Sequence, residues 1–167
     1  MQVSQIPTEF SITVFTDGSC HNQLKTGGWA SIIFVGKEKI TLKGHEAETT
    51  HHRMELVAVL EAMRFLQKNN HLGQPVTIYS DSQYVVDLLQ RRERLTTSGF
   101  RTKKLRPIRN ADLVQLVLQY IDAPGITLVK LKSHLRSSTH ESLINREVDM
   151  LSREMMRIAF RVRARSQ

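Results

Sequence analysis

The sequence lacks the features that mark secreted and membrane proteins. Its 167 residues include one cysteine, Cys20, so an internal disulfide framework is excluded and a reducing compartment is indicated. The N-terminus has no apolar stretch of signal-peptide type, and nowhere is there a run of about 18 apolar residues, as a transmembrane helix requires. Internal repeats and low-complexity linkers are also missing. We therefore expect a soluble, cytoplasmic protein with no membrane partner, built as one domain with short extensions.

Acidic residues are fewer than basic ones. The chain has 24 Lys and Arg against 16 Asp and Glu, which gives a formal net charge of +8. The excess lies in arginine-rich segments, above all in residues 91–109 and at the C-terminal end. Such a distribution is typical of a protein that binds a phosphate backbone. A basic protein without a polyanionic partner has the same composition, so charge alone leaves both interpretations open.

Hydrophobic patterning predicts an α/β fold. β-Branched and alternating segments indicate strands, and apolar residues at helical spacing indicate helices. Predicted strands cover residues 12–17, 29–36, 38–45, 76–81 and 126–132. Predicted helices cover residues 53–69, 82–89 and 111–121, and a last helix begins near Asn145. The order β-β-β-α-β-α-α-β-α is a meander followed by alternating units, which predicts a mixed sheet with helices packed on it.

Four carboxylates take comparable positions in this order. Asp17 in FTDGS and Asp81 in YSDSQ each end a strand, and Glu55 and Asp149 are expected in the first turns of two helices. Open α/β sheets bind ligands beyond the C-terminal ends of their strands, where these acids would converge. Taken singly, each acid has an ordinary alternative role, because aspartate forms turns and acids complement helix N-termini.

Converging carboxylates repel one another and are costly to bury unless a cation neutralises them. Ligand sets made only of oxygen favour Mg²⁺ or Mn²⁺ over zinc. Two such ions about 4 Å apart would hold the attacking and leaving oxygens of a phosphodiester. We therefore expect Asp17, Glu55, Asp81 and Asp149 to bind two Mg²⁺ ions, with Mn²⁺ as a possible substitute.

The motifs around these acids resemble ribonuclease H of type I. They are FTDGSC with GGWA, TTHHRMEL, YSDSQYV, VKLKSH and NREVD, which occur in the family's order from Asp17 to Asp149. The resemblance implies the RNase H-like fold, a five-stranded mixed sheet whose first three strands are antiparallel. It also implies a monomeric endonuclease that hydrolyses the RNA strand of RNA–DNA hybrids and leaves 5′-phosphate and 3′-hydroxyl ends. The domain is then expected over residues 10–160, between a short extension at 1–9 and a basic tail at 161–167.

The resemblance also implies substrate contacts. The family reads RNA 2′-hydroxyls with the residues that follow its first acid, and the matching residues here are Gly18, Ser19, Cys20 and Asn22. Positions that bind a DNA-strand phosphate in the family match Thr50 and Asn110, and Gln83 matches a minor-groove contact. The sequence departs from the family at His51 and His52, where two asparagines are usual, so binding is expected to depend on pH if these histidines contact the substrate.

Residues 91–109 match the basic protrusion of bacterial members. Their cationic side chains, among them Arg101, Lys103 and Lys104, are expected to contact phosphates and to make affinity depend on salt. Leu95 and Phe100 stand where bulkier aromatic residues are frequent, so weaker stacking is expected.

One histidine is expected to act with the carboxylates. His134 matches the family's mobile histidine, which assists proton transfer or product release. The loop between His134 and Asp149 is longer than in common bacterial forms, which makes His140 a rival candidate.

Two other functions fit the same fold. One is a noncatalytic module that binds hybrids or duplexes, and the other is the ribonuclease H domain of a reverse transcriptase. Four mutually repelling carboxylates argue against the first, because a binding module has no need of them.

Overall fold

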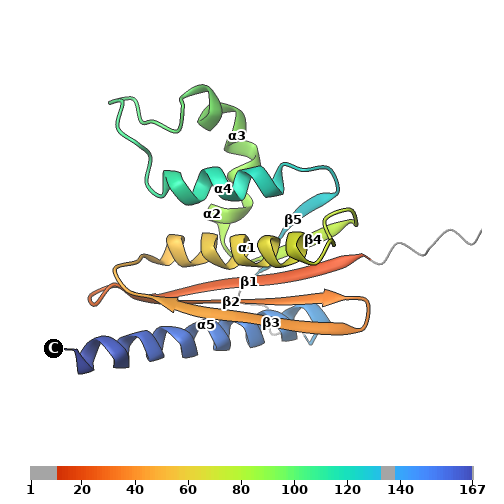
Figure 1. Cartoon of the computed structure of the whole chain (residues 1–167), viewed down its shortest axis with the longest axis horizontal. Helices are drawn as coiled ribbons and strands as arrows, with labels where there is room; N and C mark the ends of the chain where they lie inside the picture. Colours follow the sequence, from red (N-terminus) through yellow and green to blue (C-terminus); the bar gives the residue numbers. More distant parts are fainter. Residues whose placement is uncertain (1–10, 133–137, 167) are drawn as a thin grey trace, which may run out of the picture.

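The computed structural model describes residues 11–132 and 138–166, and a five-stranded sheet forms its centre (Figure 1). The strands are β1 (Ile12–His21), β2 (Thr26–Val35), β3 (Glu38–Glu46), β4 (Val76–Ser80) and β5 (Ile126–Lys130). Their order across the sheet is β3-β2-β1-β4-β5. β1, β2 and β3 are antiparallel neighbours, whereas β4 is parallel to β1 and β5 is parallel to β4. This mixed sheet with an antiparallel meander confirms the predicted fold class.

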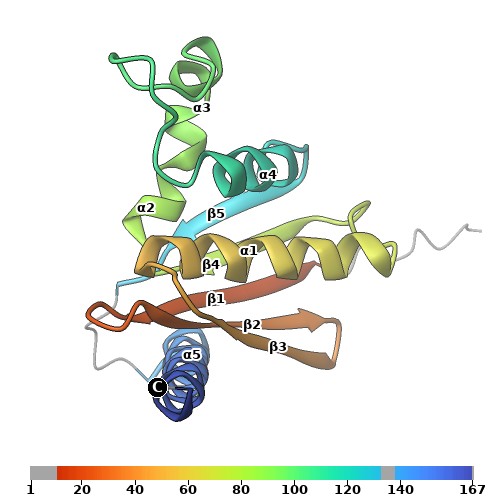
Figure 2. The same ribbon diagram turned by 60° about the vertical axis from the view of Figure 1, so that its left-hand side comes forward.

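Helices cover both faces of the sheet. They are α1 (His51–Lys68), α2 (Gln83–Val86), α3 (Leu88–Thr97), α4 (Ala111–Ile121) and α5 (His140–Arg165). α1 lies on one face with α4 packed against it, and α5 lies on the opposite face (Figures 1 and 2). Among the helices that the structure describes, none has the length and apolar character needed to cross a membrane.

Each face of the sheet has its own hydrophobic core. The helix predicted over residues 53–69 is α1, and its apolar residues are buried in the larger core: Leu56, Val59, Leu60, Met63 and Leu66. The α5 side is a smaller cluster in which Ile144 and Val148 pack against Phe15 and Ile32. α5 approaches the sheet very closely at Gly28, where an added Cβ would lie 2.3 Å from backbone atoms of Met156 and Ser152. The glycine at this position therefore allows the backbone of α5 to pack directly against β2.

The helices differ from the prediction in two places. The segment 82–89, predicted as one helix, is divided into α2 and the longer α3, with Asp87 between them. α5 begins at His140 rather than near Asn145, because the Thr139 side chain accepts the Ser142 N–H and caps the helix there. The expectation that Asp149 lies in the first turn of this helix was therefore wrong.

The segment 91–109 forms an ordered projection beyond the sheet. Its first part continues α3, and a loop then returns to α4 through a bridge between Arg101 and Pro107. Leu95 is buried and Phe100 packs against the main core. These two side chains hold the projection against the domain. Its cationic residues, among them Arg101, Lys103 and Lys104, are exposed.

Candidate active site

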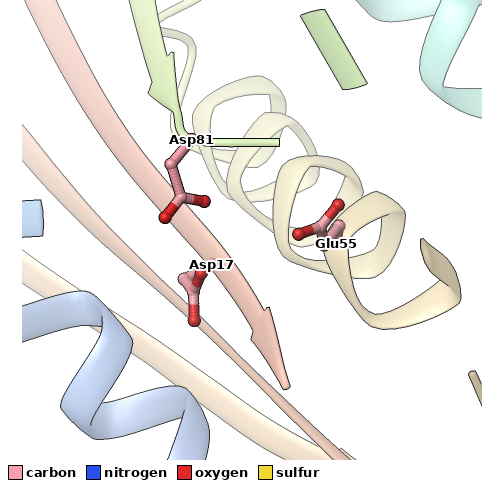
Figure 3. A group of neighbouring side chains, drawn as sticks. All are labelled: Asp17, Glu55 and Asp81. Atoms are coloured by element: carbon pink, nitrogen blue, oxygen red, sulfur yellow. The ribbon is translucent and has the colours of Figure 1, made fainter. Parts of the chain in front are cut away.

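Three carboxylates meet where the parallel pairing of β1 with β4 ends. Oxygen atoms of Asp17, Glu55 and Asp81 all lie within 4.8 Å of one another (Figure 3). β1 and β4 are parallel neighbours, and their register pairs Thr16 with Ser80. The next residue in each segment is an aspartate, so the pairing brings Asp17 and Asp81 side by side. Asp81 directly follows β4, as predicted, but the prediction that Asp17 ends its strand was wrong, because β1 continues to His21 in its antiparallel pairing with β2.

Glu55 reaches the same point from α1. Gly18 allows this approach, because a Cβ at that position would lie 2.3 Å from the Glu55 amide nitrogen. The Ser82 hydroxyl donates a hydrogen bond to Glu55 Oε2. Glu55 is 5% exposed and Asp17 is 7% exposed, so two carboxylates of the group are almost withdrawn from solvent.

Asp149 lies at the edge of this group. It is nine residues beyond the first residue of α5 and lines the same cleft, which has a volume of about 700 Å³. Its Oδ1 accepts a hydrogen bond from Arg153 Nε at 3.0 Å. The compact carboxylate group of the described residues does not include it. We call this space, lined by all four acids, the carboxylate cleft.

The electrostatics of the carboxylate cleft show an excess of negative charge. Burial, together with the charges of Asp81, Asp149 and Glu55, raises the pKa of Asp17 to about 7, although the Ser152 hydroxyl donates a hydrogen bond that opposes the rise. Burial and the charges of Glu55 and Asp149 likewise raise the pKa of Asp81. Carboxyl groups that are this hard to ionise fit a site that a divalent cation neutralises, and the ligand atoms are all carboxylate oxygens, which suits Mg²⁺ or Mn²⁺.

Two histidines stand at the entrance of the cleft, on the first turn of α1. His51 Nε2 lies 3.0 Å from Glu55 Oε1, and this hydrogen bond raises the pKa of His51 despite its partial burial. His52 Nδ1 is 3.9 Å from Glu55 Oε2. The His52 ring stacks on Tyr84 with 4.2 Å between centroids, and the Arg91 guanidinium lies 5.1 Å from the centre of the Tyr84 ring.

Not all predicted substrate contacts lie in the cleft. Gly18, Ser19, Cys20 and Gln83 line it, as do His51 and His52. Asn22 is exposed in the turn after β1 and is not part of the lining. Arg101, Lys103 and Lys104 are exposed on the projection. Cys20 donates weakly to the Thr49 carbonyl at 3.7 Å, and burial raises the pKa of its thiol, so it is not poised as a nucleophile.

Thr50 and Asn110 immediately precede α1 and α4. The Thr50 side chain caps α1 by accepting the Arg53 N–H. Asn110 does not cap α4 with its side chain; it adopts a left-handed conformation, and its buried Nδ2 has no hydrogen-bond partner among the described residues. Both guanidinium nitrogens of Arg53 contact the Asp112 carboxylate, at 3.2 and 2.9 Å. This pair ties the N-terminus of α1 to that of α4.

Of the two candidate catalytic histidines, the structure describes only His140. His134 lies outside the described residues. His140 begins α5, with its ring centroid 5.7 Å from that of Phe34. Phe34 pairs with Thr13, whereas Asp17 pairs with Ala30, so His140 lies four positions along the strand from the carboxylates and does not line the cleft.

Several residues of the site were not predicted from sequence. Ser152 and Ser82 donate to the buried carboxylates, and Lys130 Nζ donates to the Asp81 carbonyl at 2.5 Å. The position of Lys130 could have been predicted from the sequence, because it ends β5, which corresponds to a predicted strand, and pairs with Ser80 of β4. The serines had no comparable signal, since Ser82 is an ordinary helix N-cap and Ser152 is one of several polar residues on α5.

A family comparison connects this geometry to known proteins. The family model for RNase H matches residues 9–157. The chain belongs to the RNase H family. This membership confirms the resemblance inferred from the motifs and, with it, the predicted enzyme class, ribonuclease H.

Individual relatives agree with the RNase H assignment. A ribonuclease H of Chlorobium phaeobacteroides (strain BS1) is 33% identical over 125 residues, covering 74% of this chain and 83% of the relative. One of Moorella thermoacetica (strain ATCC 39073 / JCM 9320) is also 33% identical over 125 residues, with 74% and 80% covered. Among solved structures, LC9-RNase H1, described as a type 1 RNase H with the type 2 active-site motif, has a TM-score of 0.72 at 24% identity. That match covers 93% of this chain and 76% of that one. Because the identity is below 25%, this likeness supports the fold of the chain and nothing further.

Proposed function

We propose that the chain is an endonuclease that hydrolyses the RNA strand of RNA–DNA hybrids and leaves 5′-phosphate and 3′-hydroxyl ends. The observation that carries the proposal is the buried group of Asp17, Glu55 and Asp81, whose oxygens lie within 4.8 Å in a chain of the RNase H family. With Asp149 at its edge, this group offers carboxylates for two Mg²⁺ ions. When bound, such ions activate a water for in-line attack and stabilise the leaving oxygen, and Mn²⁺ can replace Mg²⁺.

The protein's own contribution is to hold the carboxylates in fixed orientations. The Ser152 hydroxyl donates to Asp17 Oδ2 and the Ser82 hydroxyl donates to Glu55 Oε2, so each of these carboxylates is held by a hydrogen bond from another element. Lys130 and His51 supply partial compensation for the negative charge before a cation binds. These fixed groups reduce the reorganisation needed when the scissile phosphate arrives.

Substrate recognition is proposed on three surfaces. The RNA strand lies along the end of β1, where Ser19, Cys20 and the Gly18 backbone meet the minor groove with its 2′-hydroxyls, and Asn22 and Gln83 extend that contact. A DNA-strand phosphate binds between Thr50 and Asn110, because the N-termini of α1 and α4 begin there and the contact of Arg53 with Asp112 ties them together. Cations of the projection, including Arg101, Lys103 and Lys104, contact further DNA phosphates.

His134, which precedes α5 in the sequence, is proposed to assist proton transfer or product release. His51 and His52 take the place of asparagines toward the 2′-hydroxyls. We further propose that the protein acts as a monomer in the cytoplasm; light scattering behind size-exclusion chromatography tests the first of these two statements, and a dimer would contradict it.

Cleavage of a labelled hybrid tests the function directly. The wild-type protein is incubated with Mg²⁺ and a hybrid labelled on its RNA strand, next to duplex RNA and duplex DNA. Asp17→Asn should abolish cleavage, whereas Glu38→Gln, which removes an exposed carboxylate at the start of β3, should not. Equal cleavage by wild type and Asp17→Asn contradicts the metal assignment, and tight hybrid binding without cleavage in Mg²⁺ or Mn²⁺ favours the noncatalytic module.

A further inference from the structure

The C-terminal half of α5 carries a cationic and aromatic surface that leads away from the carboxylate cleft. We propose that Arg157, Phe160 and Arg161 of α5, together with His21 of β1, form a track that binds the nucleic-acid strand where it continues beyond the cleft. The proposal rests on the proposed function, since its ligand is the same RNA–DNA hybrid. It extends the binding surface past residue 157, where the match to the RNase H family model ends.

The structure divides the C-terminal arginines into two kinds. Arg163 is half-buried: it pairs with Glu48 Oε1 at 2.6 Å and donates to the Leu24 carbonyl at 2.6 Å. It therefore fastens the end of α5 to the loops after β1 and β3. Arg157 and Arg161 are exposed, and within the described part of the chain neither has a carboxylate partner. Their charges remain available to a ligand.

The two available arginines continue a row on one side of the helix that begins at Arg153, which is paired with Asp149. Arg153, Arg157 and Arg161 succeed one another at four-residue spacing, which places them one above the other on successive turns. Met155 and Ala159 are buried on the side that faces the sheet. Arg153 and Arg157 line the carboxylate cleft, so Arg161 continues the same row one turn farther along. A row of cations that begins inside a phosphodiester site fits the charge of a continuing backbone.

An aromatic pair accompanies this row. β1 leads out of the cleft through Ser19 and Cys20 and ends at His21, whose ring centroid is 5.4 Å from that of Phe160. The His21 ring is held in place because its Nδ1 accepts the Leu24 N–H at 3.3 Å. Phe160 is 38% exposed although it is a large apolar side chain. Exposed rings beside a cationic groove are the usual platform for bases and sugars of a nucleic-acid strand.

The track lies on the opposite side of the cleft from the basic projection. In Figures 1 and 2 the C-terminal end of α5 lies beside the turn between β1 and β2, below the sheet, whereas α3 and its loop rise above the sheet. From Asp149 to Arg161 the helix advances twelve residues, or about 18 Å at 1.5 Å per residue. That length corresponds to about five base pairs at roughly 3.4 Å each. The track therefore contacts only hybrids that extend about five base pairs past the carboxylates.

Hybrid length is the variable that tests the track. Binding to hybrids of about 6 and about 18 base pairs is measured by fluorescence anisotropy in EDTA, where no hydrolysis occurs, at several salt concentrations. Arg161→Ala should weaken binding of the long hybrid about threefold to tenfold at low salt and should lower the salt slope by about one. The short hybrid should bind equally well. Lys37→Ala, the same charge change in the exposed turn between β2 and β3, should alter neither.

The aromatic part of the track is tested separately. Phe160→Leu keeps an apolar side chain against His21 but removes the ring face, so it should weaken binding of the long hybrid while leaving the salt slope unchanged. Circular dichroism of each variant shows whether α5 stays folded. The track is refuted if Arg161→Ala and Phe160→Leu bind the long hybrid as Lys37→Ala does. Cleavage by the wild type is measured separately. If the variants lose affinity for the long hybrid but the wild type does not cleave, the track is supported and the endonuclease function is refuted. If the wild type cleaves but the variants keep their affinity for the long hybrid, the endonuclease function is supported and the track is refuted.

Discussion

Replacing Asp17 by asparagine should stabilise the metal-free protein at neutral and higher pH. Asp17 is 7% exposed, and burial together with three neighbouring carboxylates raises its pKa to about 7. Asparagine has nearly the same shape, and its side-chain oxygen can still accept the hydrogen bond from Ser152. The substitution therefore removes a charge that the folded state holds at a cost, with little change in packing.

The size and pH range of the effect follow from linkage. The unfolded chain releases the Asp17 proton near pH 3.8, whereas the folded chain keeps it until about pH 7. Between these values unfolding releases a proton, so the stability of the wild type falls as the pH rises. Each pH unit in this window corresponds to about 1.4 kcal/mol, which gives a ceiling of about 4 kcal/mol above pH 7. The variant does not titrate at this position, so its advantage should be near zero at pH 4 and largest at pH 8.

Urea unfolding followed by circular dichroism, in EDTA at pH 4, 6 and 8, measures this difference. Glu38→Gln, an exposed carboxyl change, should show no comparable gain. Adding Mg²⁺ at pH 8 should stabilise the wild type more than the variant, because a bound cation repays the cost of the ionised group. A variant whose stability parallels that of the wild type at all three pH values would show that Asp17 ionises freely and would refute the reasoning.

Three further perturbations probe other parts of the site. Gly28→Ala places a Cβ 2.3 Å from the α5 backbone and should destabilise the fold by about 2–3 kcal/mol in thermal unfolding, whereas Gly73→Ala, with nothing within 4 Å, should not; equal effects would contradict the tight seating of α5. Glu55→Gln should abolish cleavage and move the pKa of His51 down toward its ordinary value, measured by NMR titration; an unmoved His51 would show that their hydrogen bond does not form in solution. Arg53→Ala breaks an exposed pair and should cost less than about 1 kcal/mol in urea unfolding, yet it should weaken hybrid binding by loosening the helix N-termini at the proposed phosphate site; unchanged affinity would argue against that site.

The closeness of Asp17 and Asp81 was predictable because parallel pairing leaves little freedom. Once residues 12–17 and 76–81 are taken as parallel strands of one sheet, the two acids lie near each other, and the observed register of Thr16 with Ser80 places them side by side. The pattern did not predict that β1 continues past Asp17 to His21, because that extension depends on the long pairing with β2. The identity of the family followed from the order of the motifs. These parts of the site depend on hydrogen-bond ladders, whose geometry a sequence pattern can indicate.

Other parts depended on details that the pattern does not carry. The start of α5 was misjudged because Thr139, one of several polar residues in a row, caps the helix five residues before the predicted start. Leu95 and Phe100 were taken for a reduced stacking surface, but both pack inward. The hydrogen bonds of Ser82 and Ser152 to the carboxylates could not be predicted, because their partners are 27 and 135 residues away in sequence and the contacts depend on the tertiary packing.

The distance in sequence between Asp17 and Ser152 has a consequence for how the protein is made. β1 is translated well before α5, which brings Asp149 and Ser152 to the cleft. Until α5 docks, the α5 face of β1 and β2 lacks its cover and Asp17 lacks its hydrogen-bond donor. Contacts this far apart also form slowly, because the intervening chain must be ordered first. The carboxylate cleft is therefore complete only after α5 has been synthesised and has docked on the sheet.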